Sequence, residues 1–179
     1  MVDRKVDMYQ NVTTTSGRKS FWKLKLVDTE FLKELITDHA NRPRNQRQLA
    51  RYTCKCTGKN PLCGDEVSLE IDVDQNSDVI NDIAFRARGC PISRASASIV
   101  TETCLGMTSA DAGLLAKHLR ETLTEQCPPT LPDQLSSAWS KVTPLTAIRV
   151  NPARIKCITL AWHTLCHALD NPGSTETVD

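Results

Sequence analysis

Three cysteines and one aspartate carry side chains that can bind a metal ion or react with sulfur. Cys63 and Asp65 stand on either side of Gly64 in the stretch NPLCGDEVSLEIDV, directly before an alternating strand pattern. Cys90 lies in the tripeptide GCP, and Cys157 follows the stretch NPARIK. Three thiolates and one carboxylate are a suitable set of ligands for a tetrahedral Zn²⁺ ion. The cysteines are too widely spaced for a short zinc-finger motif, so their spacing alone also allows three core residues.

Two of these cysteines stand near predicted helix starts. Pro91 directly follows Cys90 and suits the first position of a helix. Asn151 and Pro152 suit the cap and the first position of the helix that contains Cys157. The helix dipole and the unpaired backbone N–H groups at such positions stabilise a thiolate. We therefore expect the pKa of both thiols to be lowered.

The elements around these residues begin with a small sheet. Apolar residues alternate with polar ones over residues 67–73, and a second alternation over 83–87 follows the polar turn 74–77. This pattern predicts an antiparallel hairpin. Residues 51–56 are the candidate for a third strand.

Helices are predicted before and after the strands along the chain. One begins at Asp28 and ends at the NRPRN stretch, and two more cover residues 91–104 and 108–123, the latter opening with a capping box. The last runs from Asn151 to Leu169, with an apolar stripe at helical spacing. The proline-containing segment 127–150 reads as irregular.

Length and charge limit the possible functions. The chain has 179 residues, which suits one domain, and 22 Lys and Arg stand against 21 Asp and Glu. Such a balance provides no basic surface for nucleic acid or an anionic membrane. No apolar run approaches the roughly 20 residues that span a bilayer. We therefore expect a cytoplasmic protein whose eight cysteines are ligands, nucleophiles or core residues rather than disulfides.

Four stretches resemble, in order, the motifs of the SufU branch of the IscU/NifU-like iron-sulfur cluster assembly proteins. They are DHANRPRN, NPLCGDEVSLEI, INDIAFRARGCPISRASASIVTE and NPARIKCITLAWHTL. The resemblance covers a domain over residues 28–169, flanked by an N-terminal extension over 1–27 and a loose polar tail over 170–179. It implies a SufE/IscU-like α+β fold, in which a three-stranded antiparallel sheet packs against helices on one side.

The resemblance also implies roles for the four ligand candidates. Cys63, Asp65, Cys90 and Cys157 fall on zinc-ligand positions, and Cys63 also falls on the position that accepts sulfur from a PLP-dependent cysteine desulfurase of the SufS type. By the same resemblance, a partner histidine replaces Cys63 on the metal, and the released thiolate attacks the persulfide. Arg154 is expected to contact the desulfurase. A scaffold of the SufBCD type would receive the sulfur downstream.

Two features distinguish this chain from scaffolds of the IscU type. Lys156 precedes Cys157 where such scaffolds have a histidine, and the segment between Cys90 and Cys157 is lengthened as in SufU. The resemblance therefore favours a zinc-dependent sulfurtransferase. Two alternatives stay open: an iron-sulfur cluster scaffold that uses the same cysteines for a transient cluster, and a zinc-stabilised adaptor that activates the desulfurase.

The other cysteines and histidines fit structural roles. Cys54 and Cys56 depart from the family pattern and are interpreted as a packed or surface strand pair, with an auxiliary sulfur or metal role as the alternative. His39 is expected to be a structural hydrogen-bonding residue. Core, loop or solvated helix positions are expected for the remaining ones, which are Cys104, Cys127, Cys166, His118, His163 and His167.

Overall fold

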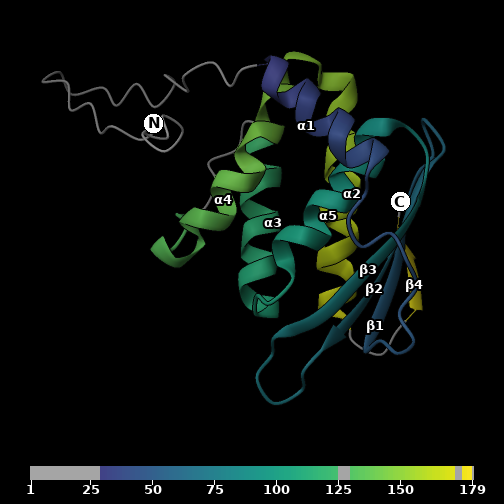
Figure 1. The fold of residues 1–179 in the computed structure, drawn as a ribbon, viewed down its shortest axis with the longest axis vertical. Coiled ribbons are helices and arrows are strands. Elements are labelled where there is room, and N and C mark those ends of the chain that lie inside the picture. Colours follow the sequence, from purple (N-terminus) through teal and green to yellow (C-terminus); the bar gives the residue numbers. More distant parts are fainter. Residues whose placement is uncertain (1–28, 125–129, 172–174, 179) are drawn as a thin grey trace, which may run out of the picture.

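The described part of the chain is built on a three-stranded antiparallel sheet with helices on one face (Figure 1). The computed structural model describes residues 29–124, 130–171 and 175–178. β1 (Cys54–Asn60) pairs with β2 (Asp65–Val73), which also pairs with β3 (Ile80–Arg88). The predicted α+β fold and its antiparallel sheet are therefore confirmed. The predicted extension over 1–27 and Cys127 lie outside the described residues.

The hairpin of β2 and β3 follows the alternation in the sequence. Val67, Leu69 and Ile71 on β2 are fully buried, and so are Ile83 and Phe85 on β3. Leu69 stands opposite Phe85, and Ile71 stands opposite Ile83. Because alternate side chains of a strand point to opposite faces, these residues form one apolar face, which the helices cover.

The remaining antiparallel strand lies further along the chain than its prediction. The pattern predicts it over 51–56, whereas β1 begins at Cys54 and continues to Asn60. The last three residues of β1 read GKN and have little strand preference of their own. Their pairing with β2, which extends to the pair Asn60 and Asp65, keeps them in the sheet. The paired part of this hairpin therefore ends at Asp65, which belongs to the predicted site.

A fourth strand, β4 (Thr175–Val178), joins the sheet from the predicted tail. It pairs in parallel with β1 and gives the strand order β3-β2-β1-β4. The expectation of a loose tail over 170–179 is therefore wrong for these four residues. Without β4, the outer edge of β1 would present unpaired backbone N–H and C=O groups. The tail pairs with them through its own backbone, so this pairing does not require apolar side chains.

Four of the helices were predicted from sequence. They are α1 (Thr29–Asn41), α2 (Pro91–Cys104), α3 (Ser109–Leu123) and α5 (Ile155–Asp170). α5 packs on β1 and β2, α2 packs on β3 and α5, and α3 packs on the other side of α5. Trp162 of α5 is buried in this core. No helix in the described ranges is long and apolar enough to cross a membrane.

The segment predicted to be irregular is largely helical. It contains the short 3-10 helices η1 (Asp133–Leu135) and η2 (Thr143–Val150) on either side of α4 (Ser136–Val142). Pro132 directly precedes η1, and Pro144 stands in the first turn of η2, where the missing N–H group costs no hydrogen bond. Leu135, Val142 and Leu145 are buried and fix this segment to the domain.

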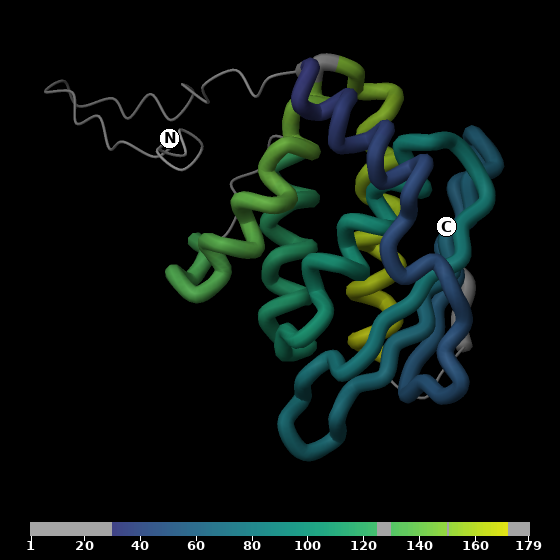
Figure 2. Tube along the Cα trace, viewed as in Figure 1, coloured from purple at the N-terminus to yellow at the C-terminus, as the bar shows by residue number. Residues whose placement is uncertain are grey.

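The segment 42–53 crosses the sheet before it enters β1 (Figure 2). Phe85 N on β3 donates to Asn45 O at 3.0 Å. Leu49 N donates to Glu70 Oε2 on β2 at 2.9 Å. This segment therefore buries Glu70 on the sheet face opposite the helices.

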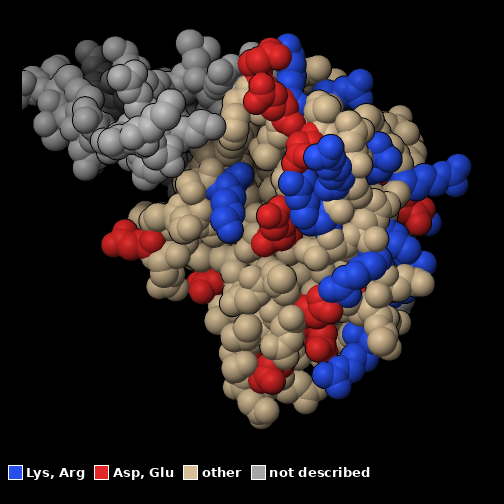
Figure 3. All heavy atoms as spheres, in the orientation of Figure 1, with Lys and Arg blue, Asp and Glu red and all other residues tan. Residues whose placement is uncertain are grey.

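His39 connects this segment's start to α2. Its Nδ1 lies 2.9 Å from Ser98 Oγ, which also accepts a hydrogen bond from Arg44 N at 2.8 Å. The predicted structural role of His39 is confirmed. On the face shown in Figure 3, acidic and basic side chains are interspersed, as the balanced charge of the sequence led us to expect.

Candidate metal centre

The turn between β1 and β2 carries Cys63 on its tip. Gly64 N and Cys63 N donate to Asn60 O at 2.8 and 3.3 Å, and Leu62 N donates to Asn60 Oδ1 at 3.2 Å. Gly64 adopts φ +72°, a left-handed conformation that glycine reaches without strain. The tip of the turn is open to water: Cys63 is exposed, and Leu62 is 80% exposed.

Asp65 follows directly as the first residue of β2, and its side chain points into the protein. The residue is only 3% exposed. Its Oδ1 accepts a hydrogen bond from Cys90 N at 2.9 Å, and its Oδ2 accepts one from Cys90 Sγ at 3.3 Å. Gly89, at the end of β3, has φ +146°, and a Cβ atom there would overlap the Asp65 carboxylate. A glycine is therefore required for this close approach.

Cys90 is the N-cap residue of α2. Its Sγ accepts a hydrogen bond from Ser93 N at 3.4 Å, and Pro91 takes a position in the first turn, as predicted. The thiol is partly buried between the helix start and Asp65. The end of β3 and the start of α2 therefore hold the Cys90 sulfur against the carboxylate.

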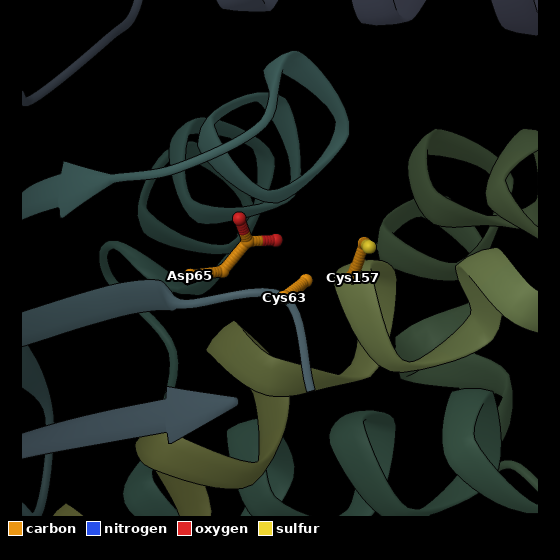
Figure 4. Close-up of side chains that lie close together, drawn as sticks. All are labelled: Cys63, Asp65 and Cys157. Carbon is orange, nitrogen blue, oxygen red and sulfur yellow. The ribbon is translucent and has the colours of Figure 1, made fainter. Parts of the chain in front are cut away.

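Cys157 reaches the same place from α5. It is the third residue of that helix and is 2% exposed. Figure 4 shows the side chains of Cys63, Asp65 and Cys157 converging from the turn, the sheet and the helix. Their ligand atoms all lie within 4.8 Å of one another. Bond lengths of about 2.0–2.3 Å in a tetrahedral zinc site place neighbouring ligand atoms roughly 3.5–3.8 Å apart, so the group fits such an ion with a small contraction.

The start of the last helix differs from its prediction. Pro152 begins the short 3-10 helix η3 (Pro152–Arg154), and α5 follows from Ile155. Asn151 precedes η3 but makes no side-chain capping hydrogen bond. The tighter turn of η3 replaces the predicted cap, and it places Arg154 beside Cys157, whose thiol forms a hydrogen bond with the guanidinium group.

The predicted lowering of the thiol pKa is wrong for Cys157. Burial, followed by the nearby Cys90, raises the pKa of Cys157 to about 12, and the hydrogen bond from Arg154 opposes this only in part. Cys157 lies in the first turn, where the helix dipole acts, but the desolvation of a side chain that water hardly reaches outweighs that effect. Without a cation, Cys157 is therefore a neutral thiol.

Asp65 behaves in the opposite way. Burial raises the pKa of Asp65, but hydrogen bonds from Cys90 N–H and from the three surrounding thiols outweigh it and hold this pKa below its usual range. The site therefore holds one carboxylate ringed by thiols. A divalent metal ion would displace the thiol protons and supply the positive charge that the carboxylate faces.

Three of the four predicted ligands, Cys63, Asp65 and Cys157, bring their ligand atoms together. Cys90 is not part of that group, but its thiol contacts Asp65 Oδ2 at 3.3 Å and forms a hydrogen bond with Cys157. Gly89 was not singled out from the sequence, although its place between a strand and Cys90 is a usable signal for a close backbone approach. Arg154 is exposed beside the site. Its predicted contact with a desulfurase stays a prediction.

The second pair of cysteines lies away from this site. Cys54 and Cys56 are each 1% exposed and point toward the helices from the far half of β1, opposite Ile71 and Leu69. Burial raises the pKa of Cys54. Both are packed core residues, as the first of the two interpretations predicted. No disulfide joins any of the seven cysteines in the part of the chain that the structure describes.

Comparisons with known proteins show the family of this chain. The NifU-like N terminal domain family matches residues 32–172. An iron-sulfur cluster assembly scaffold protein IscU from Streptococcus pyogenes serotype M1 is 33% identical over 142 residues, covering 79% of this chain and 84% of that protein. A zinc-dependent sulfurtransferase SufU from Bacillus subtilis strain 168 is 31% identical over 139 residues, covering 78% and 88%.

A solved structure extends the comparison to three dimensions. It is described as a candidate iron-sulfur cluster assembly scaffold protein for the SUF system of Fervidobacterium islandicum AW-1. It aligns with a TM-score of 0.66 and 28% identity, covering 76% of this chain and 94% of that chain. The chain therefore belongs to the family of NifU-like N-terminal domains, as a member of its IscU/SufU type.

Proposed function

We propose that this chain is a zinc-dependent sulfurtransferase in iron-sulfur cluster assembly, with Cys63 as the acceptor of persulfide sulfur from a cysteine desulfurase. The observation that carries the proposal is the unequal burial of the ligands. Cys63 is exposed on a glycine turn, whereas Asp65 and Cys157 are 3% and 2% exposed. One ligand can therefore leave the site while the others stay in place.

In this proposal, three residues hold the zinc ion and one residue moves. Zinc, when bound, supplies the positive charge that stabilises the thiolate forms of its cysteine ligands. Asp65, Cys90 and Cys157 hold fixed positions because a strand start and two helix starts carry them. The open space around Gly64, where an added Cβ would meet no atom within 4 Å, lets the turn move Cys63 outward.

The transfer itself is a thiolate exchange on sulfur. The Cys63 thiolate attacks the terminal sulfur of a persulfide on the partner's cysteine. A bond forms between the Cys63 sulfur and that terminal sulfur, and the bond between the two partner sulfurs breaks. The partner's thiolate leaves with the electron pair, so no oxidant or reductant is consumed. Cys63 then carries the persulfide for delivery to a downstream acceptor, which we propose is a scaffold of the SufBCD type.

Two exposed side chains near Cys63 suit a docking partner. Leu62, directly before the acceptor, is 80% exposed, and an apolar side chain so open to water is a plausible anchor in a protein interface. Arg154 lies on the other side of the site, next to Cys157. We propose that a PLP-dependent, SufS-like desulfurase contacts both residues when it presents its persulfide.

A cluster scaffold is the second candidate, because one relative at 33% identity is described as a scaffold. Lys156, directly before Cys157, is exposed and is a poor ligand while it is charged. This residue favours the sulfurtransferase. A third possibility is an adaptor that activates the desulfurase without accepting sulfur.

Metal analysis combined with persulfide trapping separates these possibilities. The protein is purified without added iron, its metals are measured, and it is then incubated with desulfurase and cysteine before mass spectrometry. We expect about one zinc per chain and one additional sulfur atom on the peptide that contains Cys63. Iron with the visible absorption of a cluster would support the scaffold, whereas zinc with no sulfur on Cys63 would support the adaptor.

A further inference from the structure

Ser93 in the first turn of α2 has a buried hydroxyl with no hydrogen-bond partner among the described residues. The residue is 1% exposed. Leaving such a group unsatisfied costs about 1–3 kcal/mol, so nearly all buried hydroxyls in proteins are paired. The Ser93 hydroxyl beside the candidate metal centre is therefore available as a donor to an acceptor at that centre.

Other buried serines of the same helix show the usual behaviour. Ser96 Oγ donates to Ile158 O at 2.7 Å and accepts from Trp162 Nε1 at 3.1 Å. Ser98 Oγ binds His39 Nδ1 and Arg44 N. Ser93 therefore differs from its neighbours in hydrogen bonding and not in burial.

Ser93 stands at a position of α2 from which a rotation of its side chain can bring the hydroxyl to the N-cap residue Cys90. Cys90 is the N-cap and Ser93 stands three residues later, which is the spacing at which a side chain reaches back to the cap in a capping box. Side chains in helices also lean toward the N-terminus. Ser93 N already donates to Cys90 Sγ at 3.4 Å, and the hydroxyl oxygen is only three bonds away from that nitrogen.

The Cys90 sulfur changes as an acceptor when it binds metal. Its thiol proton is donated to Asp65 Oδ2 at 3.3 Å. A metal-bound cysteine has lost this proton and carries negative charge on sulfur, which makes it a much better hydrogen-bond acceptor. The backbone N–H of Cys90 is not available to Ser93, because it is directed at Asp65 Oδ1.

We propose that Ser93 is a positioning residue whose hydroxyl donates a hydrogen bond to Cys90 Sγ in the metal-bound site. This inference rests on the proposed function, because it requires Cys90 to be a zinc ligand. Two donors on one sulfur, the N–H and the O–H of Ser93, reduce its electron donation and hold it in place. Cys90 then stays a fixed, unreactive ligand while Cys63 exchanges.

The test compares Ser93→Ala with Ser96→Ala in the full chain, with and without zinc. Zinc affinity is measured by competition with a chelator, and thermal stability is measured for both forms. We expect Ser93→Ala to weaken zinc binding by about tenfold to a hundredfold. Its metal-free form should melt at or above the wild-type temperature, because the substitution removes an unsatisfied hydroxyl. Ser96→Ala should lower the melting temperature of both forms equally.

Cobalt substitution adds a readout that packing alone does not affect. Loss of a hydrogen bond to Cys90 Sγ should shift the sulfur-to-cobalt charge-transfer band of Ser93→Ala to longer wavelength, with no shift for Ser96→Ala. Wild-type zinc affinity together with an unshifted band in Ser93→Ala would overturn the role of Ser93 and leave the proposed function intact. Failure of the wild-type protein to bind zinc or cobalt would overturn both.

Discussion

β2 carries two buried carboxylates that are stabilised in different ways. Glu70, 4% exposed, forms ion pairs with Lys55 Nζ at 2.9 Å and with Arg86 at 3.7 Å, and it accepts a hydrogen bond from Leu49 N. Asp65, 3% exposed, is surrounded by thiols, and no ion pair with Lys or Arg forms at Asp65 in the described part of the chain. A buried carboxylate is costly without a positive partner.

This difference indicates what each of the two carboxylates does. Glu70 already has its cations, so it fastens the segment 42–53 to the sheet. Asp65 has thiol donors, and these thiols are the metal ligands of the proposed zinc site. The comparison therefore supports a cation site at Asp65 on grounds of charge, independently of any resemblance between sequences.

The largest expected effect is the loss of metal after a change at Asp65. Asp65→Asn removes the negative charge that balances a divalent ion, and we expect zinc affinity to fall by about a hundredfold or more. Glu70→Gln is the matched control, because it makes the same kind of change at the other carboxylate and should leave zinc content unchanged. Zinc content and affinity are measured for both. Full zinc occupancy in Asp65→Asn would contradict its assignment as a ligand.

A large effect on stability is expected for Cys157→Ser. The hydroxyl is a weak zinc ligand, and water cannot easily replace a ligand that is 2% exposed. A ligand present at about a thousandfold above its Kd contributes about 4 kcal/mol, which corresponds to roughly 8–16 °C in a domain of this size. Thermal unfolding of zinc-loaded protein should show this loss. An unchanged melting temperature would mean that Cys157 does not bind the metal.

A smaller effect is expected at Gly89. Gly89→Ala would place a methyl group against the Asp65 carboxylate in a backbone conformation that alanine rarely adopts. We expect a loss of about 2–3 kcal/mol together with weaker zinc binding. Gly106→Ala is the control, since Gly106 has φ +80° but open space around it, so only backbone strain applies. Chemical denaturation measures both variants, and equal losses with equal zinc affinities would remove the special role of Gly89.

The smallest expected effect concerns pH. Burial raises the pKa of Glu70. The opposing effect is larger and comes from Lys55, Leu49 N–H and Arg86, so the folded pKa lies below the ordinary value of 4.5. A carboxylate with a depressed folded pKa stabilises the protein above its unfolded pKa and loses this contribution as pH falls through the folded pKa. The acid-induced loss of unfolding free energy below pH 4.5 should therefore be smaller in Glu70→Gln than in wild-type protein. Urea unfolding of metal-free protein across this range is the measurement, and identical pH dependence would contradict it.

Local patterns predicted much of this fold. The alternation from Val67 to Val73 and the proline after Cys90 indicated the hairpin and α2 correctly, because both depend on neighbouring residues in the chain. The end of β1 and the strand β4 were missed. Their residues are kept in the sheet by partner strands and not by their own preferences.

The site likewise has features that local motifs predict and features that depend on distant parts of the chain. Its four ligand candidates were predicted from motifs, whereas the raised pKa of Cys157 was not, because desolvation depends on how deeply α5 packs. The unpaired hydroxyl of Ser93 was also invisible in the sequence, since neighbouring serines in the same helix are satisfied by contacts from distant segments.

The exchangeable ligand is tested most directly by desulfurase turnover with zinc-loaded Cys63→Ser. Water can take the place of an exposed ligand, and three protein ligands are enough for a bound zinc ion, so this variant should keep its zinc and nearly its full melting temperature. Because its acceptor thiol is missing, we predict that it gains no persulfide and does not stimulate the desulfurase. Full stimulation by zinc-loaded Cys63→Ser would contradict the account and would identify the chain as an adaptor.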